Sequence, residues 1–106
     1  MSMASQEEEA AQAANVGADL EKPLAGEDPG SDSLAEVERW VAVYQQLVEL
    51  EQHLFDTLAF HIPKMQDSAR REAEETNLPV LLTQLERFRH RLAYWQRRRD
   101  ELEAQR

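Results

Sequence analysis

The sequence predicts an all-α protein, an antiparallel helical hairpin or a minimal three-helix bundle with a long–short–long order of helices. Two observations predict this fold. Two long stretches carry apolar residues at alternating steps of three and four, a spacing that only a helix places on one face. Two prolines then divide the chain, and no glycine follows Gly30, so the prolines mark the clear turns. We expect coiled-coil-like packing of the two long helices, preceded by a disordered acidic N-terminal tail.

The first long helix is predicted at approximately residues 34–61, and it begins at a capping motif. Ser33 can accept hydrogen bonds from the free backbone N–H groups of the first turn, and Glu36 can reach back to the cap. A second apolar stripe, which includes Trp40 and Leu54, runs beside the main one. The apolar face is therefore wider than a two-stranded seam requires, which indicates a helix with two neighbours. The main stripe consists of Leu34, Val37, Val41, Tyr44, Val48, Phe55, Leu58 and Ile62.

A short middle helix is predicted at approximately residues 63–77, between two proline breaks. Pro63 lacks the N–H that a helix needs and its ring crowds the carbonyl four residues back, so the first helix ends or kinks near His61. Pro79 suits the first turn of the next helix, where its missing N–H costs nothing, and Asn77 precedes it as a cap or turn residue. The middle helix either extends the first helix or forms a third element.

The last long helix is predicted at approximately residues 79–104, with a heptad stripe whose one gap is filled by Arg99. Seven Arg and four acidic residues give residues 79–106 a net charge of +3, which suits an antiparallel pairing with the acidic first helix. The stripe consists of Leu78, Leu81, Leu85, Phe88, Leu92, Trp95 and Leu102. The opposite face carries Arg87, Arg89, His90, Arg91, Arg97 and Arg98.

Residues 1–32 are predicted to be a disordered acidic tail, and residues 33–106 a single helical domain. One Lys and eight acidic residues give residues 1–33 a net charge of −7. The tail holds all three glycines and two prolines but few large apolar residues, so it cannot bury enough surface to offset the entropy of ordering. Its Glu- and Ala-rich residues 7–14 favour a transient helix.

The composition excludes several classes of protein. The whole chain of 106 residues has a net charge of −9, which disfavours nonspecific binding to nucleic acid or anionic membranes. No run of about 18 apolar residues occurs, so no membrane span is expected. The absence of Cys and of a basic and apolar leader favours a cytoplasmic protein. Because the predicted folded part of about 73 residues gives a marginal core, self-association as a homo-oligomer is expected.

The basic and aromatic residues of the last helix are the predicted partner-binding site. Arginine binds carboxylate and phosphate with a two-pronged geometry and stacks on aromatic rings. The predicted function is a non-enzymatic helical protein–protein interaction module, an adaptor or regulatory subunit, which presents this helix to an acidic or helical partner. The alternative is binding of a phosphate ligand, a nucleotide or nucleic acid by the same arginines. The predicted site residues are Arg87, Arg91, Tyr94, Trp95, Arg97 and Arg98.

Two further expectations concern this basic face. It can also be an ordinary solvated helix surface that holds no ligand. If it does bind anions, the acidic N-terminal tail of the same chain can compete for it.

Two polar residues interrupt the apolar stripes, Glu51 in the first long helix and Arg99 in the last. A carboxylate that faces a core is costly unless it is paired, so Glu51 is expected to meet an arginine such as Arg99 and to set the register of the helices. No catalytic residue, metal site or cofactor is predicted, because nucleophile triads, glycine-rich phosphate loops and zinc-binding patterns are absent from the sequence.

Overall fold

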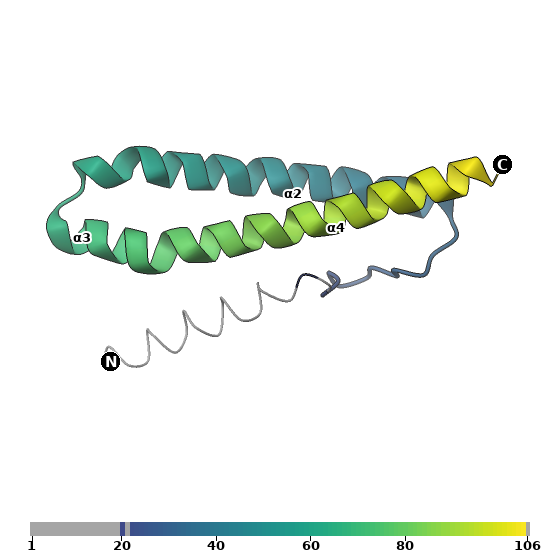
Figure 1. Ribbon diagram of the computed structural model, residues 1–106, viewed down its shortest axis with the longest axis horizontal. Coiled ribbons are helices and arrows are strands. Elements are labelled where there is room, and N and C mark those ends of the chain that lie inside the picture. The colour runs from purple at the N-terminus through teal and green to yellow at the C-terminus, as the bar shows by residue number, and fades with distance from the viewer. Residues whose placement is uncertain (1–19, 21, 106) are drawn as a thin grey trace.

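The computed structural model describes residue 20 and residues 22–105, and its two long helices form an antiparallel hairpin (Figure 1). Helix α2 spans Leu34–His61, and helix α4 spans Leu78–Ala104. Every regular element in the described part of the chain is helical. The predicted all-α class with two long helices is therefore confirmed.

Helix α2 begins and ends where the local sequence predicts. The Ser33 side chain accepts a hydrogen bond of 3.3 Å from the backbone N–H of Glu36, which satisfies one of the free donors of the first turn. At the other end a single 3₁₀ turn, η1 (Ile62–Lys64), follows His61 and contains Pro63. Met65 then adopts an extended conformation, so the chain leaves the helix and reverses direction.

The second rod of the hairpin is longer than α4 alone, and this differs from the predicted break at Asn77–Pro79. Helix α3 (Asp67–Glu72) continues through a π-helical turn, η2 (Ala73–Asn77), directly into α4. The backbone N–H of Leu78 bonds to the carbonyl of Ala73, five residues back.

This continuity has a physical reason. Proline at position 79 has no N–H to donate to the carbonyl four residues back, and its ring crowds that carbonyl. The wider π-helical turn just before Pro79 gives the ring room while the rod continues. The expectation of a separate middle helix over residues 63–77 is therefore corrected, because most of that range extends the last helix rather than the first (Figure 1).

Aromatic side chains fix the register of the two rods. The Trp40 and Trp95 rings stack with centroids 6.5 Å apart, and Tyr44 meets Phe88 with centroids 6.1 Å apart. Trp40 and Trp95 are both buried, as the pairing of two apolar stripes requires. The main buried cluster lies at the end of the hairpin where α2 begins, and consists of Val37, Trp40, Val41, Tyr44, Phe88 and Trp95.

A third layer covers this end of the hairpin. Residues 22–33, called the strap below, have no regular secondary structure but turn twice, with hydrogen bonds of 3.1 Å from Glu27 N to Leu24 O and from Ser31 N to Asp28 O. Gly26 has a φ of +84°, a conformation that side-chain-bearing residues rarely adopt, and so permits the first turn.

The strap lies within residues 1–32, for which the sequence predicts a disordered tail. Residues 1–19 and 21 lie outside the described residues, as does the helix expected at residues 7–14. The described part of this range follows α4. Hydrogen bonds from Arg87 and Arg91, and the packing of Leu24 against the core, offset the entropy of ordering it.

Candidate functional site

The side of α4 turned towards the strap carries Arg87, Arg91, Tyr94, Trp95 and Arg98, and we call it the arginine–aromatic face. Steps of three and four residues place its members in one row along the helix. The contacts of the row with the strap follow the chain in order. Arg87 donates to the carbonyl of Lys22, Arg91 to Glu27, and Arg98 to Asp32.

One carboxylate lies at the centre of this face. The Glu27 side chain is completely buried, and each of its two oxygens accepts two hydrogen bonds. Oε1 accepts from Arg91 Nη2 and from Trp95 Nε1, both at 2.5 Å. Oε2 accepts from the Tyr44 hydroxyl and from the backbone N–H of Leu24, both at 2.6 Å. The strap, α2 and α4 therefore all meet at one ionised group.

The electrostatics of this cluster favour the ionised pair. Burial by itself raises the pKa of Glu27, but the hydrogen bonds from Tyr44, Arg91, the Leu24 backbone and Trp95 outweigh it and hold the pKa below the ordinary value. Burial and donation to Glu27 raise the pKa of Tyr44 to about 12, so its hydroxyl remains a donor at neutral pH. The Arg91 side chain is only 2 % exposed, so the neighbouring Glu27 carboxylate stabilises its buried charge.

Acidification should therefore weaken the fold through Glu27. Because the folded state lowers its pKa, the stabilisation from Glu27 is present above the ordinary carboxyl value of 4.5 and is lost as the pH falls through the lowered folded value. Urea unfolding at a series of pH values measures this dependence. Glu27→Gln should flatten the acid limb of the profile, and an unchanged acid limb in that variant would contradict the prediction.

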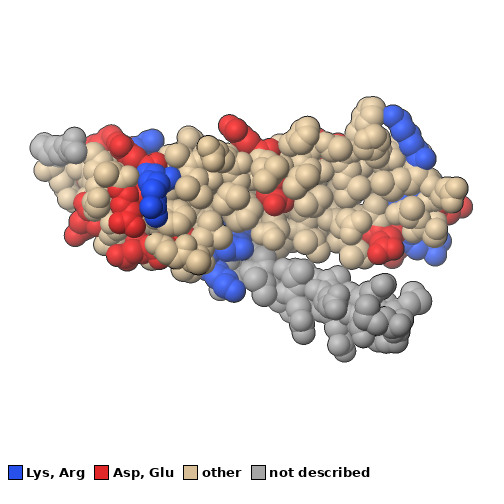
Figure 2. Space-filling model, turned by 180° about the vertical axis from the view of Figure 1, so that it is seen from behind, with Lys and Arg blue, Asp and Glu red and all other residues tan. Residues whose placement is uncertain are grey.

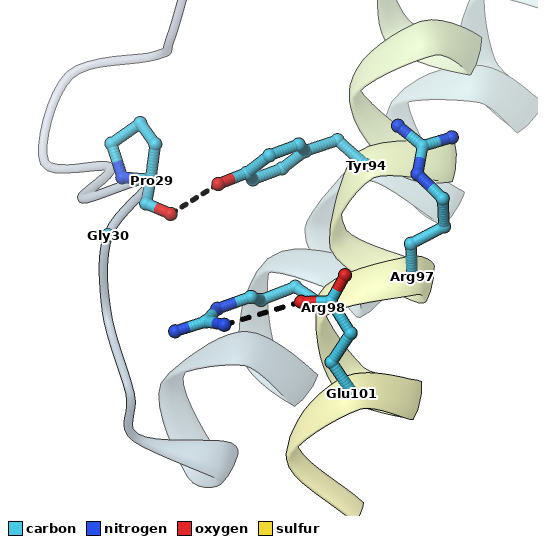
Figure 3. Close-up of a pocket in the computed structure, with 6 residues that line it drawn as sticks. All are labelled: Pro29, Gly30, Tyr94, Arg97, Arg98 and Glu101. Atoms are coloured by element: carbon cyan, nitrogen blue, oxygen red, sulfur yellow. Dashed lines mark hydrogen bonds and ion pairs between the residues drawn. The ribbon is translucent and has the colours of Figure 1, made fainter. Parts of the chain in front are cut away.

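An open cavity of about 350 Å³ lies between the strap and the C-terminal part of α4 (Figure 3). The Tyr94 hydroxyl donates to the Pro29 carbonyl, and Arg98 also pairs with Glu101 at 3.3 Å. Tyr94 and Arg98 reach towards the strap, whereas the Arg97 guanidinium points away from it (Figure 3). The wall of the cavity therefore carries both a guanidinium group and a carboxylate, and the lining consists of Pro29, Gly30, Tyr94, Arg97, Arg98 and Glu101.

The structure brings most of the predicted site residues together but not as one exposed surface. Arg91 and Trp95 are buried under the strap, and Arg87 is 7 % exposed. Tyr94 and Arg98 are half-buried, and Arg97 is exposed. The part of the predicted site that solvent can reach is therefore its C-terminal end.

Sequence reasoning missed the acceptors of this face, Glu27 and Asp32, and the donor Tyr44 on α2. Asp28 lies next to Glu27 and is exposed, so charge alone does not distinguish the two positions. Leu24 is the residue that could have indicated an ordered segment here. An apolar residue among turn-forming glycines and prolines is typical of an ordered turn as well as of disorder.

Glu51 and Arg99 do not meet. From the level of the Trp40–Trp95 contact, Glu51 lies towards the turn and Arg99 away from it, which separates them by roughly 20 Å along the rods. Arg99 pairs instead with the neighbouring Asp100 at 3.8 Å. Glu51 Oε2 is buried without a hydrogen-bond partner among the described residues, and burial raises the pKa of this carboxyl.

Two other kinds of feature are absent from the described residues. Among residues 20 and 22–105, no three His, Asp or Glu side chains gather in a way that could hold a metal ion. No helix in that same part of the chain has the length and apolar character to cross a membrane. Comparisons with protein-family models, curated proteins and solved structures give no match to this chain.

Proposed function

We propose that the protein is a non-enzymatic helical interaction module, an adaptor or regulatory subunit, which binds an acidic segment of a partner protein through the arginine–aromatic face of α4. One observation carries this proposal. The face already holds an acidic segment of its own chain, with Arg91 on Glu27 and Arg98 on Asp32. Arginine side chains arranged in this way recognise carboxylates with charge-assisted hydrogen bonds.

The partner binds at the C-terminal end of the face. Arg91 and Trp95 are committed to the buried Glu27, so they position the strap and α4 rather than contact a partner. Arg97 is exposed, and the outer side of Arg98 borders the cavity beside Tyr94. A carboxylate of the partner that enters this cavity meets the Arg98 guanidinium and the apolar surface of Pro29, with Arg97 at the edge of the cavity.

The second candidate function uses the same cavity for a phosphate-bearing ligand. Arg98, with Arg97 beside it among the lining residues, can also hold a phosphate. The net charge of −9 disfavours nucleic acid as that ligand, because the repulsion acts along a whole polyanion. A compact phosphate group is repelled less strongly by the net negative charge.

Self-association and coiled-coil-like packing of the long helices also belong to this proposal. Phe60 is 64 % exposed and Leu82 41 % exposed, so apolar surface remains on the hairpin that a second copy or another helical partner can cover. The measurement that addresses this point is the mass of the protein in solution.

The double variant Arg97→Ala with Arg98→Ala should weaken binding of an oligoglutamate peptide by about tenfold or more, because two charge-assisted contacts are lost. Titration calorimetry at low and moderate salt measures the affinities. The matched control is Arg70→Ala with Arg71→Ala on α3, which changes the net charge equally at a distance from the cavity.

The two functions give different results in this experiment. An equal loss of peptide affinity in both double variants would mean that peptide binding depends on the total charge alone, which would overturn the proposal. Binding of inorganic pyrophosphate but not of the peptide, abolished by the same Arg97 and Arg98 substitutions, would favour the phosphate-binding function.

A further inference from the structure

The Arg98 guanidinium, which a partner's carboxylate has to meet, already pairs with two carboxylates of its own chain. Nη2 donates to Asp32, and Nη1 donates to Glu101 at 3.3 Å. Figure 2 shows acidic and basic side chains gathered at the end of the hairpin where α4 ends. Because one positive charge here faces two negative charges, a third carboxylate is repelled unless one of the two in-chain carboxylates moves away.

Asp32 is the more firmly placed of the two carboxylates. It belongs to the strap, which also contacts Arg98 through the Ser31 carbonyl, the acceptor of a hydrogen bond of 3.4 Å from Nε. The strap is anchored before this point by the buried Glu27 and continues after it into α2. Asp32 is also not among the residues that line the cavity. We therefore expect a ligand in the cavity to leave the pair of Arg98 and Asp32 in place.

Glu101 is the carboxylate that a ligand in the cavity meets. It lines the cavity, its side chain is 61 % exposed, and it extends towards Arg98 (Figure 3). The contact of 3.3 Å is long for a charge-assisted hydrogen bond, which usually measures about 2.7–2.9 Å. Exposed ion pairs between neighbouring turns of a helix contribute little to stability. Glu101 can therefore leave Arg98 at little cost to the fold.

A second arginine lies within reach of Glu101. Glu101 follows Arg98 by three residues and Arg97 by four, and both spacings place side chains next to each other on a helix. Arg97 is exposed and lines the same cavity. A glutamate that leaves Arg98 can therefore pair with Arg97 by rotating its own side chain, while the backbone of α4 stays in place.

We propose that Glu101 is an in-chain competitor of the partner's carboxylate. In the free protein Glu101 pairs with Arg98. In the complex the partner's carboxylate takes its place on Arg98, and the displaced Glu101 pairs with Arg97. This inference rests on the proposed function, and it adds to that function the residue that limits the affinity.

In the full-length protein, Glu101→Gln should raise the affinity for an oligoglutamate peptide about three- to fivefold, because the competing charge is removed from Arg98. The matched control is Glu103→Gln, which changes the net charge equally. Glu103 is exposed on the same helix, about 160° around it from Glu101. The control should change the affinity by less than about twofold, since it acts only through screened, long-range charge. Titration calorimetry measures the affinities.

A double-mutant cycle tests the role of Arg97. Arg97→Ala should lower the peptide affinity about two- to threefold in the chain that carries Glu101, because the displaced carboxylate then has no new partner. In the Glu101→Gln background the same substitution should leave the affinity unchanged. A direct contact between Arg97 and the peptide predicts instead the same loss in both backgrounds.

The outcomes separate this inference from the proposed function. A gain confined to Glu101→Gln, with an effect of Arg97→Ala only when Glu101 is present, supports the inference. Equal affinities of Glu101→Gln and the wild type, equal gains in the two glutamate variants, or equal losses from Arg97→Ala in both backgrounds overturn it. If the wild type binds the peptide and the Arg97 and Arg98 double variant does not, the proposed function survives any of these results. If neither the wild type nor Glu101→Gln binds the peptide, both are wrong.

Discussion

Glu27→Gln should lower the free energy of unfolding by about 3–5 kcal/mol, one of the two largest effects expected for a single substitution in this protein. The substitution keeps the shape of the side chain but removes its charge. It removes the carboxylate that pairs with the Arg91 guanidinium, whose side chain is 2 % exposed. It also replaces one acceptor oxygen with an amide NH₂ that opposes donors such as Trp95 Nε1. Urea unfolding followed by circular dichroism measures the change.

The matched control for this prediction is Asp28→Asn, one residue further along the strap. Asp28 is exposed, and among the described residues its carboxylate accepts only from the backbone N–H of Gly30 at 3.0 Å. We expect its loss to cost less than about 1 kcal/mol. Similar destabilisation by the two substitutions would mean that the buried pair adds little beyond the general charge of the strap.

A second variant separates the charge of Arg91 from the packing of the strap. Combining Glu27→Gln with Arg91→Met removes the buried cation as well as the carboxylate. Since part of the penalty of the single substitution comes from the loss of the carboxylate beside a buried cation, the double variant should recover part of the lost stability. No recovery would indicate that the four hydrogen bonds, rather than the ion pair, account for the effect.

The sequence predicts α2 well because its determinants are local. A capping serine, an apolar stripe and a terminating proline all act within a few residues of the helix they define. The same local reasoning is misleading at Pro79. A proline at the first turn of a new helix and a proline that a π-helical turn accommodates have the same sequence, and only the path of the rod distinguishes them.

The sequence predicts the α4 residues of the site but not the strap residues that they contact. Helical periodicity is enough to place the arginines and aromatics of α4 in one row. Their partners are 64 to 68 residues away in sequence, and composition gives no sign of which acidic residue in the strap is buried. Glu27 becomes distinct from its neighbours only when Arg91, Trp95 and Tyr44 have been assembled by the hairpin. A segment that looks disordered by its charge can therefore be ordered by its contacts.

Trp95→Ala should lower the free energy of unfolding by about 3–5 kcal/mol, since it removes a large and completely buried side chain from the main cluster. Trp95 stacks on Trp40 and meets the Tyr94 ring edge-on, with centroids 5.2 Å apart. Its Nε1–H also donates to Glu27, so the same residue joins the core to the strap. Urea unfolding measures the loss, and Phe60→Ala, at an aromatic position that is 64 % exposed, is the control.

The two roles of Trp95 can be separated by a milder substitution, which also remains informative if Trp95→Ala does not fold. Trp95→Phe keeps an aromatic ring on Trp40 but has no N–H for Glu27. If the hydrogen bond holds the strap, hydrogen exchange of the strap amides should accelerate in Trp95→Phe more than exchange in the middle of α2. Uniform acceleration throughout the hairpin would show instead that Trp95 acts only through packing, and that the strap depends on the core as a whole rather than on this one donor.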